Sequence, residues 1–330
     1  MCFMPSSRIV GTGSYAPPKT RTNADLEKMV ETNDEWIVTR TGISERHVSS
    51  DEEATSDIAY EAAIQALAAA NLDPLDLDMI LVATITPDMF FPSTACALQD
   101  RLGARRAGAM DVSAACSGFV YGLAVADGLL RLGTLRTILV VGAETLTKVV
   151  NWQDRNTCVL FGDGAGAMVL RAAEGERGIL STHLFADGSK GPMLILPGGG
   201  SRHPMSQSVL DAGLCKIHMS NGNEVFKIAV RALEDACLTA LKHNWLEVSD
   251  VDLLVPHQAN LRIINAVGQR LGVPEEKVCV NIQKYGNTSA ASIPLALDGA
   301  VQAGRVKAGD LVLLCAFGGG LTWGSALIRW

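Results

Sequence analysis

The chain lacks the cysteine patterns of metal-binding and disulfide-rich proteins. Its eight cysteines include no Cys-x-x-Cys pair and no Cys/His spacing suited to zinc, so we expect no metal. A chain of 330 residues is also too long to need a disulfide framework. Residues 1–10 have no charged segment followed by an apolar stretch, which predicts a reduced, cytoplasmic protein without a secretory leader. Seven cysteines are interpreted as structural: Cys2, Cys96, Cys158, Cys215, Cys237, Cys279 and Cys315.

Further absences narrow the class of protein. No apolar run reaches the 18 residues that a membrane-spanning helix needs. The net charge is −7, which argues against nucleic acid as a partner. The glycine-rich stretches 11–13 and 162–166 lack a complete dinucleotide fingerprint, and no Walker-type lysine follows a glycine cluster. We interpret these glycines as packing and turn positions and expect no nucleotide cofactor.

The chain does contain short and strongly apolar segments. Hydrophobic residues make up 48% of the sequence, enough for a large core in one big or two medium domains. Segments 137–141 and 311–314 are β-branched or aliphatic. Such segments are typical of strands in a sheet that helices cover on both faces, which favours an α/β fold.

One pattern occurs twice along the chain. A helix-like segment, an acidic turn and a buried strand occupy residues 66–82, and the same order recurs at residues 240–255, 174 positions later. Units of this kind also resemble one another through composition alone, which is the alternative interpretation. True duplication predicts two similar α/β halves, residues 1–174 and 175–330, each with a mostly parallel sheet and with helices packed between the sheets.

Cys116 lies in the most informative context of the sequence. Small residues surround it in segment 111–119, and a long apolar run follows up to Leu132. This layout predicts a strand, a tight turn and a helix whose first turn carries Cys116. The N-terminus of a helix favours the thiolate and lowers the pKa of a cysteine. The alternative is a small cysteine of the core, because free cysteines are often buried.

Two polar turns and one glycine turn can complete a site. His257 follows a strand at 252–255 and precedes a helix at about 261–271, and ligands of open α/β sheets bind beyond the carboxyl ends of strands. Asn287 lies in a second polar turn that opens onto a helix, and glycines 318–320 follow a buried strand. Each has an ordinary alternative as a helix cap, a turn residue or a tight turn.

Cys116, His257 and Asn287, in this order and these contexts, resemble the β-ketoacyl-acyl-carrier-protein synthase III family of the thiolase-fold superfamily. The similarity runs nearly end to end and includes segments 9–15, 33–43, 161–166 and 322–326. It implies a five-layered α-β-α-β-α fold of two duplicated halves. It also implies the initiating enzyme of type II fatty acid synthesis, a homodimer without a cofactor. Its substrates would be an acyl-CoA, acetyl-CoA by family default, and malonyl-acyl-carrier protein.

The resemblance also implies roles for the three residues. Cys116 would attack the thioester and carry the acyl group, with the backbone N–H groups of Cys116 and Gly319 holding the oxyanion. Malonyl-acyl-carrier protein would then lose CO2 in a decarboxylative Claisen condensation. His257 and Asn287 would donate hydrogen bonds to the enolate oxygen.

Substrate-handling residues carry over from the same resemblance. Trp36 and Arg155 match positions that sandwich the adenine of CoA, and Arg40 matches one near its phosphates. Phe91 matches a residue that lines the acyl pocket of the partner in a dimer. Phe317 matches a residue beside the cysteine that helps decarboxylation.

A basic patch for an acidic carrier protein would comprise Lys227, Arg262 and Arg270. A family basic position is Gln269 here, and ordinary solvated charge is the alternative. The alternative functions are polyketide-, quinolone- or olefin-type condensation and acyl transfer or hydrolysis without condensation. An inert acyl-CoA-binding module and a Cys-His peptidase are more distant alternatives.

Overall fold

The structure is a computed structural model that describes residues 6–330, so Cys2 lies outside the described residues. Two sheets dominate it. The first has the strand order β1-β7-β6-β4-β5, and the second has the order β11-β12-β13-β8. The strands of the first sheet are β1 (Ser6–Tyr15), β4 (Met79–Ala83), β5 (Gly108–Val112), β6 (Thr137–Glu144) and β7 (Gly164–Ala173). Those of the second are β8 (Gly178–Ala186), β11 (Leu253–Pro256), β12 (Leu311–Gly318) and β13 (Thr322–Arg329).

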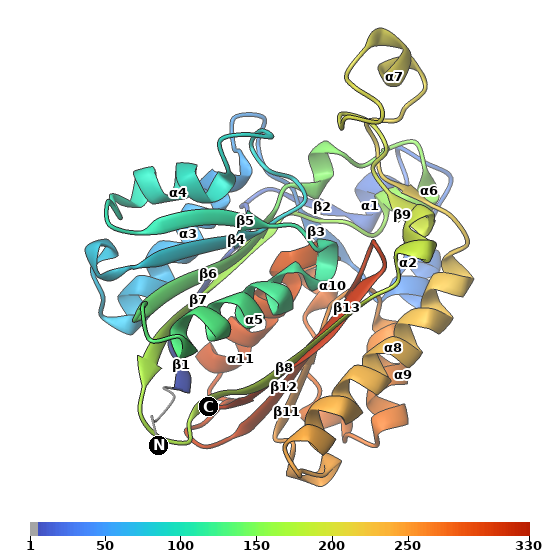
Figure 1. Cartoon of the computed structure of the whole chain (residues 1–330). Helices are drawn as coiled ribbons and strands as arrows, with labels where there is room; N and C mark the ends of the chain where they lie inside the picture. The colour runs from blue at the N-terminus through green and yellow to red at the C-terminus, as the bar shows by residue number, and fades with distance from the viewer. Residues whose placement is uncertain (1–5) are drawn as a thin grey trace.

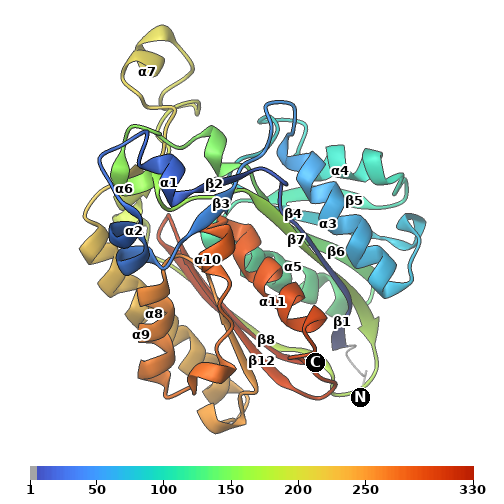
Figure 2. The same cartoon turned by 180° about the vertical axis from the view of Figure 1, so that it is seen from behind.

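Helices form three layers around these sheets. The central helices α5 (Gly118–Arg131) and α11 (Ser292–Gln302) lie between the sheets, and each contacts strands of both (Figure 1). Helices α3 (Thr55–Ala70) and α4 (Thr94–Leu102) cover the outer face of the first sheet. Helices α8 (Gly222–His243) and α9 (Leu261–Leu271) cover the outer face of the second (Figure 2). The predicted five-layered α-β-α-β-α fold is therefore confirmed.

Shorter elements lie around the ends of the sheets. Helices α1 (Asn23–Leu26), α2 (Asp34–Thr41), α6 (Arg155–Cys158) and the hairpin of β2 (Thr20–Thr22) and β3 (Glu45–His47) lie close together (Figure 2). The hairpin of β9 (Leu194–Ile195) and β10 (His218–Met219) supports a projecting segment with α7 (Gln207–Asp211) at its tip (Figure 1). The one-turn helix α10 (Ile282–Tyr285) precedes Asn287.

The expectation of mostly parallel sheets is wrong. In the first sheet β4 runs parallel to β5 and β6, but β7 is antiparallel to both of its neighbours. In the second sheet only β11 and β12 are parallel. The link from β12 to β13 is residues 319–321, whereas a parallel crossover needs about a dozen residues or more. A link this short makes a hairpin.

The repeated unit of the sequence is present in the structure. Helix α3 leads through a short turn to β4, and helix α8 leads through a similar turn to β11. Strand β7 of the first sheet ends at Ala173, and β8 of the second begins at Gly178. The division of the chain at residue 174 stays a prediction.

The glycines near the N-terminus allow β1 to pack tightly on α3. A Cβ atom on Gly11 would lie 2.2 Å from the Ala66 carbonyl oxygen, and one on Gly13 would lie 2.5 Å from that of Ala62. Both contacts are with backbone and cannot be relieved by a side-chain movement. The interpretation of these glycines as packing positions is confirmed.

Three features of the described residues bear on the expected class of protein. Within residues 6–330 no helix is long and apolar enough to cross a membrane. The same residues contain no group of three or more His, Cys, Asp or Glu side chains placed to hold a metal ion. All seven cysteines that the structure describes are free thiols.

Candidate active site

A pocket of about 530 Å³ opens at the carboxyl ends of β11 and β12, and it is lined by the three residues predicted to be catalytic. Cys116 comes from the turn ahead of α5, His257 from the end of β11, and Asn287 from the loop after α10. All three side chains are buried. Residues that are 171 positions apart in the sequence, Cys116 and Asn287, therefore meet in one cavity.

Cys116 lies just before the helix that follows it. It occupies the single 3-10 turn Ala115–Ser117, and α5 begins at Gly118, so the predicted placement in the first turn of the helix is wrong by two residues. The turn starts with Ala115 at a φ of 46°, a left-handed conformation that costs an alanine about 1–2 kcal/mol. Strain of this kind is typical of functional sites, where the surrounding structure holds it in place.

The Cys116 thiol is not activated at rest. Burial raises the pKa of the thiol to about 12, and the charge of Glu144 raises it further while a contact with Ser289 lowers it. The expected lowering of this pKa by the helix N-terminus is therefore not the dominant effect. Cys116 is only 6% exposed, so the loss of water around the thiolate outweighs the helix dipole.

His257 is a neutral imidazole in this environment. Burial lowers its pKa to about 3, and it is 2% exposed. Its backbone N–H donates to the Cys315 carbonyl at 2.8 Å, which continues the pairing of β11 with β12. Among the residues that the structure describes, neither ring nitrogen has a hydrogen-bond partner. No protein contact selects a tautomer, so either nitrogen can carry the proton that it donates to a ligand.

Asn287 is oriented by its own loop. Its Oδ1 accepts a hydrogen bond from the Ser289 N–H at 2.9 Å, which leaves the amide nitrogen as a donor in the pocket. Its backbone is paired with the segment after α6, through a hydrogen bond from Asn287 N–H to the Leu160 carbonyl and another from Gly162 N–H to the Asn287 carbonyl. These contacts fix the side chain from both ends.

The glycine turn after β12 packs against the nucleophile. A Cβ atom on Gly318 would lie 2.6 Å from the Cys116 backbone nitrogen, so only glycine allows this approach. Thr322 at the start of β13 donates to the Ala114 carbonyl at 2.9 Å and tightens the contact. Gly319 is the next residue along the hairpin, and its Cβ position lies 3.8 Å from the Ala115 side chain; its oxyanion role stays a prediction.

The predicted adenine sandwich is closed in this structure. The guanidinium of Arg155 lies 4.7 Å from the centre of the Trp36 ring, and that of Arg40 lies 4.5 Å from it. Arg155 also donates to the Glu31 carbonyl at 2.8 Å. Trp36 and Arg40 line the pocket. A purine can enter between Trp36 and Arg155 only after the arginine has moved away from the indole.

The two phenylalanines of the prediction lie in different surroundings. Phe317 is buried and lines the pocket near Cys116 and His257. Phe91 is 85% exposed and does not line the pocket of its own chain. The neighbouring Phe90 approaches the projecting segment, with its ring 3.6 Å from the Cβ position of Gly199.

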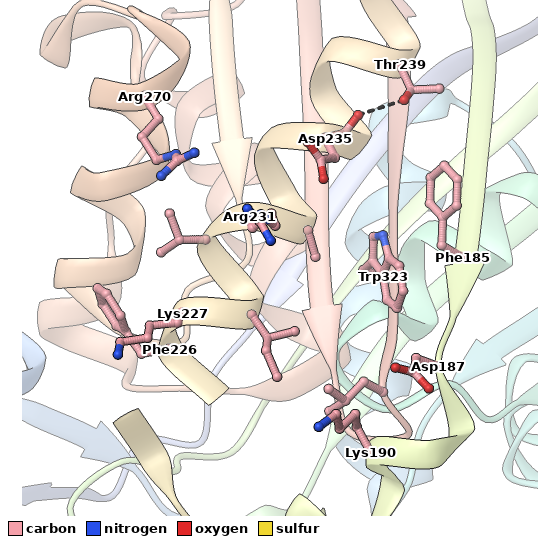
Figure 3. Close-up of a pocket in the computed structure, with 14 residues that line it drawn as sticks. Phe185, Asp187, Lys190, Phe226, Lys227, Arg231, Asp235, Thr239, Arg270 and Trp323 are labelled. Atoms are coloured by element: carbon pink, nitrogen blue, oxygen red, sulfur yellow. Dashed lines mark hydrogen bonds between the residues drawn. The ribbon is translucent and has the colours of Figure 1, made fainter. Parts of the chain in front are cut away.

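The three residues predicted for carrier-protein docking are divided between two hollows. Arg262 lines the active-site pocket, where it lies over the Phe226 ring. Lys227 and Arg270 line a separate groove of about 750 Å³ between α8, α9 and the strands β8 and β13 (Figure 3). Phe185 and Trp323 stack on one wall of this groove.

Charges in this second groove are partly paired. Arg270 bonds Glu234 at 2.6 Å, and Lys190 approaches Glu224 at 3.3 Å. Arg231 also lines the groove, and it forms none of the ion pairs found within residues 6–330. The sequence did not single out Arg231, although its spacing of four residues from Lys227 places it on the same face of a helix.

Sequence reasoning missed a buried carboxyl close to Cys116. Glu144 ends β6 and is completely buried, and its Oε2 accepts hydrogen bonds from Thr84 Oγ1, Ile85 N–H and Thr86 Oγ1 at 3.2, 3.1 and 2.7 Å. Burial raises its pKa to about 7. The signal was an acidic residue at the carboxyl end of an otherwise apolar strand, which is the edge where α/β sheets bind ligands.

Comparison with known proteins places the chain in a family. The family model described as 3-oxoacyl-[acyl-carrier-protein] synthase III matches residues 110–188, and the model of its C-terminal region matches residues 241–330. The β-ketoacyl-[acyl-carrier-protein] synthase III of Caldanaerobacter subterraneus subsp. tengcongensis is 54% identical over 330 residues, which cover 100% of this chain and 99% of that protein.

Solved structures agree with the sequence matches. The 3-oxoacyl-[acyl-carrier-protein] synthase III of Aquifex aeolicus VF5 has a TM-score of 0.91 and 50% identity, with 98% of this chain and 100% of that chain covered. The priming β-ketosynthase from the R1128 polyketide biosynthetic pathway has a TM-score of 0.92 and 35% identity, with 100% and 97% covered. Since the match extends over the whole length at this identity, the chain belongs to the β-ketoacyl-[acyl-carrier-protein] synthase III family.

Proposed function

We propose that this protein starts type II fatty acid synthesis by condensing an acyl-CoA primer with malonyl-acyl-carrier protein. The observation that carries the proposal is one buried pocket that holds a thiol, a neutral imidazole and a free amide donor, on Cys116, His257 and Asn287. The chemistry uses only these groups and the two thioester substrates, so it requires no metal or other cofactor.

In the first half-reaction, Cys116 attacks the thioester carbonyl of the primer. The S–C bond forms, the carbonyl oxygen becomes an oxyanion, and the backbone N–H groups of Cys116 and Gly319 stabilise it. Collapse of the intermediate expels CoA and leaves the acyl group on Cys116. Because the thiol is protonated at rest, its proton must leave during the attack.

In the second half-reaction, the malonyl group loses CO2 and forms an enolate. The donors for the enolate oxygen are a ring N–H of His257 and the Asn287 amide. A neutral imidazole suits this role, since it donates a hydrogen bond without holding a buried positive charge. The carbanion then attacks the acyl group on Cys116, and the β-ketoacyl product leaves on the carrier protein. Phe317 keeps this part of the pocket apolar, which favours loss of the charged carboxylate.

Two sets of binding residues belong to this proposal. Trp36, Arg40 and Arg155 bind the CoA nucleotide once Arg155 has moved. Lys227, Arg262 and Arg270, joined by Arg231, receive the acidic carrier protein beside the two hollows, which share Phe226 as a lining residue.

The active form is a cytoplasmic homodimer in which Phe91 reaches the partner's acyl pocket. A monomer leaves an apolar group exposed to water, which supports an interface here. This apolar group comprises the exposed Phe90 and Met205, which both lie within 4 Å of the Cβ position of Gly199, and the neighbouring Phe91.

The test is the mass of the intact protein after incubation with a panel of acyl-CoAs. Wild type gains one acyl group, and Cys116→Ala gains none. The matched control is Cys96→Ala, which removes an exposed thiol outside the pocket and leaves the gain unchanged. Addition of malonyl-acyl-carrier protein then removes the label as a β-ketoacyl thioester. Absence of an adduct with every acyl-CoA would refute the proposal.

A priming step in polyketide synthesis is the second candidate, favoured by the similarity to the R1128 priming β-ketosynthase. The two functions differ in the carrier protein that accepts the acyl group. Purified malonyl-carrier proteins of each kind, offered to the acylated enzyme in parallel, distinguish them by the rate at which the label leaves Cys116.

A further inference from the structure

Two buried carboxyl groups near the active site differ in how completely they are hydrogen-bonded. Asp163 accepts from Ser49 N–H, Ser49 Oγ, Thr147 N–H and Thr147 Oγ1, so both of its oxygens are bonded. Within residues 6–330, Glu144 accepts three hydrogen bonds on Oε2, while Oε1 accepts none of standard geometry. A buried oxygen without a partner costs about 1–3 kcal/mol, so Glu144 has a cost that Asp163 does not have. A purely structural carboxyl does not account for this difference.

A second unpaired polar atom lies between Glu144 and Cys116. Ser289 is completely buried, and its hydroxyl makes no hydrogen bond of standard geometry within residues 6–330. The same hydroxyl approaches both groups closely enough to lower the pKa of the Cys116 thiol and that of the Glu144 carboxyl. Ser289 starts the turn Ser289–Ala291, which packs on one side against β6 and on the other against the turn of Cys116.

The backbone holds the Ser289 hydroxyl in this place. Ser289 has a φ of 49°, and its N–H donates to the Asn287 side chain. On the β6 side, Gly142 lies so close to the turn that an added Cβ would be 2.3 Å from the Ala290 carbonyl oxygen. The hydroxyl is therefore fixed by a left-handed residue, by a catalytic neighbour and by a tight strand contact.

We propose that Glu144 is a positioning residue that acts through the Ser289 hydroxyl to accept the proton of the Cys116 thiol. As the sulfur attacks the thioester carbon, the S–H bond breaks and its proton passes to Ser289 Oγ, while the proton of Ser289 passes to Glu144 Oε1. When the C–S bond to the leaving thiolate breaks, the proton returns through Ser289 to that thiolate. Glu144 ends as the carboxylate with which it began.

The acid–base properties of the pocket favour this route over the imidazole. The thiol has a pKa of about 12, Glu144 of about 7 and His257 of about 3. Transfer to Glu144 is therefore less unfavourable than transfer to His257. It also moves one negative charge instead of creating two opposite charges in a buried site.

Few other groups can titrate in this part of the pocket. The end of β4 presents the uncharged Thr84 and Thr86, and the turn 289–291 presents a serine and two alanines. Among residues 6–330, Glu144 is the only charge found to act on the pKa of Cys116, and His257 stays neutral well below pH 7.

The test is alkylation of Cys116 by iodoacetamide between pH 6 and 9, read by peptide mass spectrometry. The exposed Cys96 is an internal control, since its rate should follow ordinary thiol ionisation in every variant. In wild type we expect the Cys116 rate to level off above about pH 7, where Glu144 is ionised. In Glu144→Gln we expect the rate at pH 7.5 to fall by roughly 10²-fold, the lower end of general-base effects, and to rise steadily with pH.

Two more variants separate the relay from a structural role. Ser289→Ala should show the same loss as Glu144→Gln, and alanine suits this backbone because Ala115 adopts nearly the same φ in the other turn. Glu144→Asp retains a carboxyl and should recover part of the rate and the plateau. Thermal unfolding of each variant identifies any that has failed to fold.

Simple charge repulsion predicts the opposite sign. If Glu144 only repels the thiolate, its removal lowers the pKa of Cys116 and speeds alkylation. A faster Glu144→Gln variant, or a wild-type rate that keeps rising through pH 9, would overturn the inference. The inference depends on the proposed role of Cys116, but alkylation needs no acyl-CoA, so the failure of one is distinguishable from the failure of the other.

Discussion

The turn that carries Cys116 has a counterpart in the second half of the molecule. The turns 115–117 and 289–291 each precede a central helix, and their first residues, Ala115 and Ser289, lie 174 positions apart. Both first residues are left-handed, with φ of 46° and 49°. The next position holds the thiol in one turn and the methyl group of Ala290 in the other. The two halves thus each contain a strained turn, the two turns pack together, and only one of them carries a thiol.

The strands beside the two turns differ in the same way. Strand β6 ends in the buried acid Glu144, whereas β12 ends in Phe317 and Gly318. The first half therefore places a carboxyl behind the pocket, and the second places an apolar ring and a glycine turn beside the nucleophile. At equivalent positions of the fold, the end of β6 therefore provides a group that can accept a proton, and the end of β12 provides close packing.

The largest expected effect comes from moving the thiol between the turns. Cys116→Ala should abolish acylation, and the added change Ala290→Cys should not restore it. Ala290 is buried and does not line the pocket, whereas Cys116 does. Intact-protein mass after treatment with acetyl-CoA measures both variants. Acylation of the doubly changed protein would mean that the two turns are chemically interchangeable.

The second effect distinguishes the role proposed for Cys116 in the first half from the role proposed for the hydrogen-bond donors His257 and Asn287 in the second. His257→Ala and Asn287→Ala should each slow decarboxylation by roughly 10²–10³-fold, as the loss of one oxyanion donor does elsewhere. Acylation of Cys116 should change much less, since the proposal assigns its oxyanion to backbone groups. Release of CO2 from malonyl-acyl-carrier protein and protein mass report the two steps. Equal losses in both steps would contradict this division of labour.

Sequence alone could predict what depends on local pattern. The helix-turn-strand unit was visible because burial on both faces demands a continuous apolar strand, and Cys116, His257 and Asn287 each follow or precede such an element. The strand directions were not visible. The short link at 319–321 makes β13 antiparallel to β12, but β7 is antiparallel to β6 across the long connection 145–163, so no single local pattern gives the directions.

Properties that arise from three-dimensional packing could not be predicted from the sequence. The pKa of Cys116 depends on how completely water is excluded, and the neighbours of its turn include the turn 289–291 and Gly318, both more than 100 residues away in the sequence. Ser289 and Glu144 gained their importance only when the turn 289–291 was seen against β6. The closed contact between Arg155 and Trp36 is likewise a matter of side-chain placement.

The third effect is on the pH dependence of stability. Glu144 in the first half and His257 in the second change the free energy of unfolding with pH in opposite directions. The pKa of Glu144 is raised from 4.5 to about 7, so its contribution is present below pH 4.5 and is lost as pH rises to about 7. The pKa of His257 is lowered from 6.5 to about 3, so its contribution is present above pH 6.5 and is lost as pH falls. Between pH 4.5 and 6.5 the two slopes oppose each other.

Single variants should expose each slope. Glu144→Gln should make stability rise more steeply with pH, by roughly 3 kcal/mol over the full window at about 1.4 kcal/mol per pH unit. His257→Asn should make stability fall with pH in the same window. Urea unfolding at pH 4.5, 5.5 and 6.5 measures both. If the free energy of unfolding varied with pH in the same way for wild type and Glu144→Gln, this carboxyl would not be desolvated.

The smallest effect tests the contact that holds the second turn against the first half. Gly142→Ala should lower the free energy of unfolding by about 1–3 kcal/mol, because its Cβ would meet the Ala290 carbonyl oxygen at 2.3 Å and the turn must shift. The position 174 residues later is Ala316, which already has a Cβ, so this close approach belongs to one half only.

A control substitution at another glycine should change the free energy of unfolding in the opposite direction. Gly128 lies within α5 with nothing within 4 Å of its Cβ position, so Gly128→Ala should raise the free energy of unfolding by about 0.5–1 kcal/mol. Urea unfolding of both variants at one pH gives the comparison. If Gly142→Ala were as stable as Gly128→Ala, the turn 289–291 would be free to move. The Ser289 hydroxyl would then have no fixed place between the thiol and the carboxyl, and the difference between the two turns would reduce to the presence of the thiol alone.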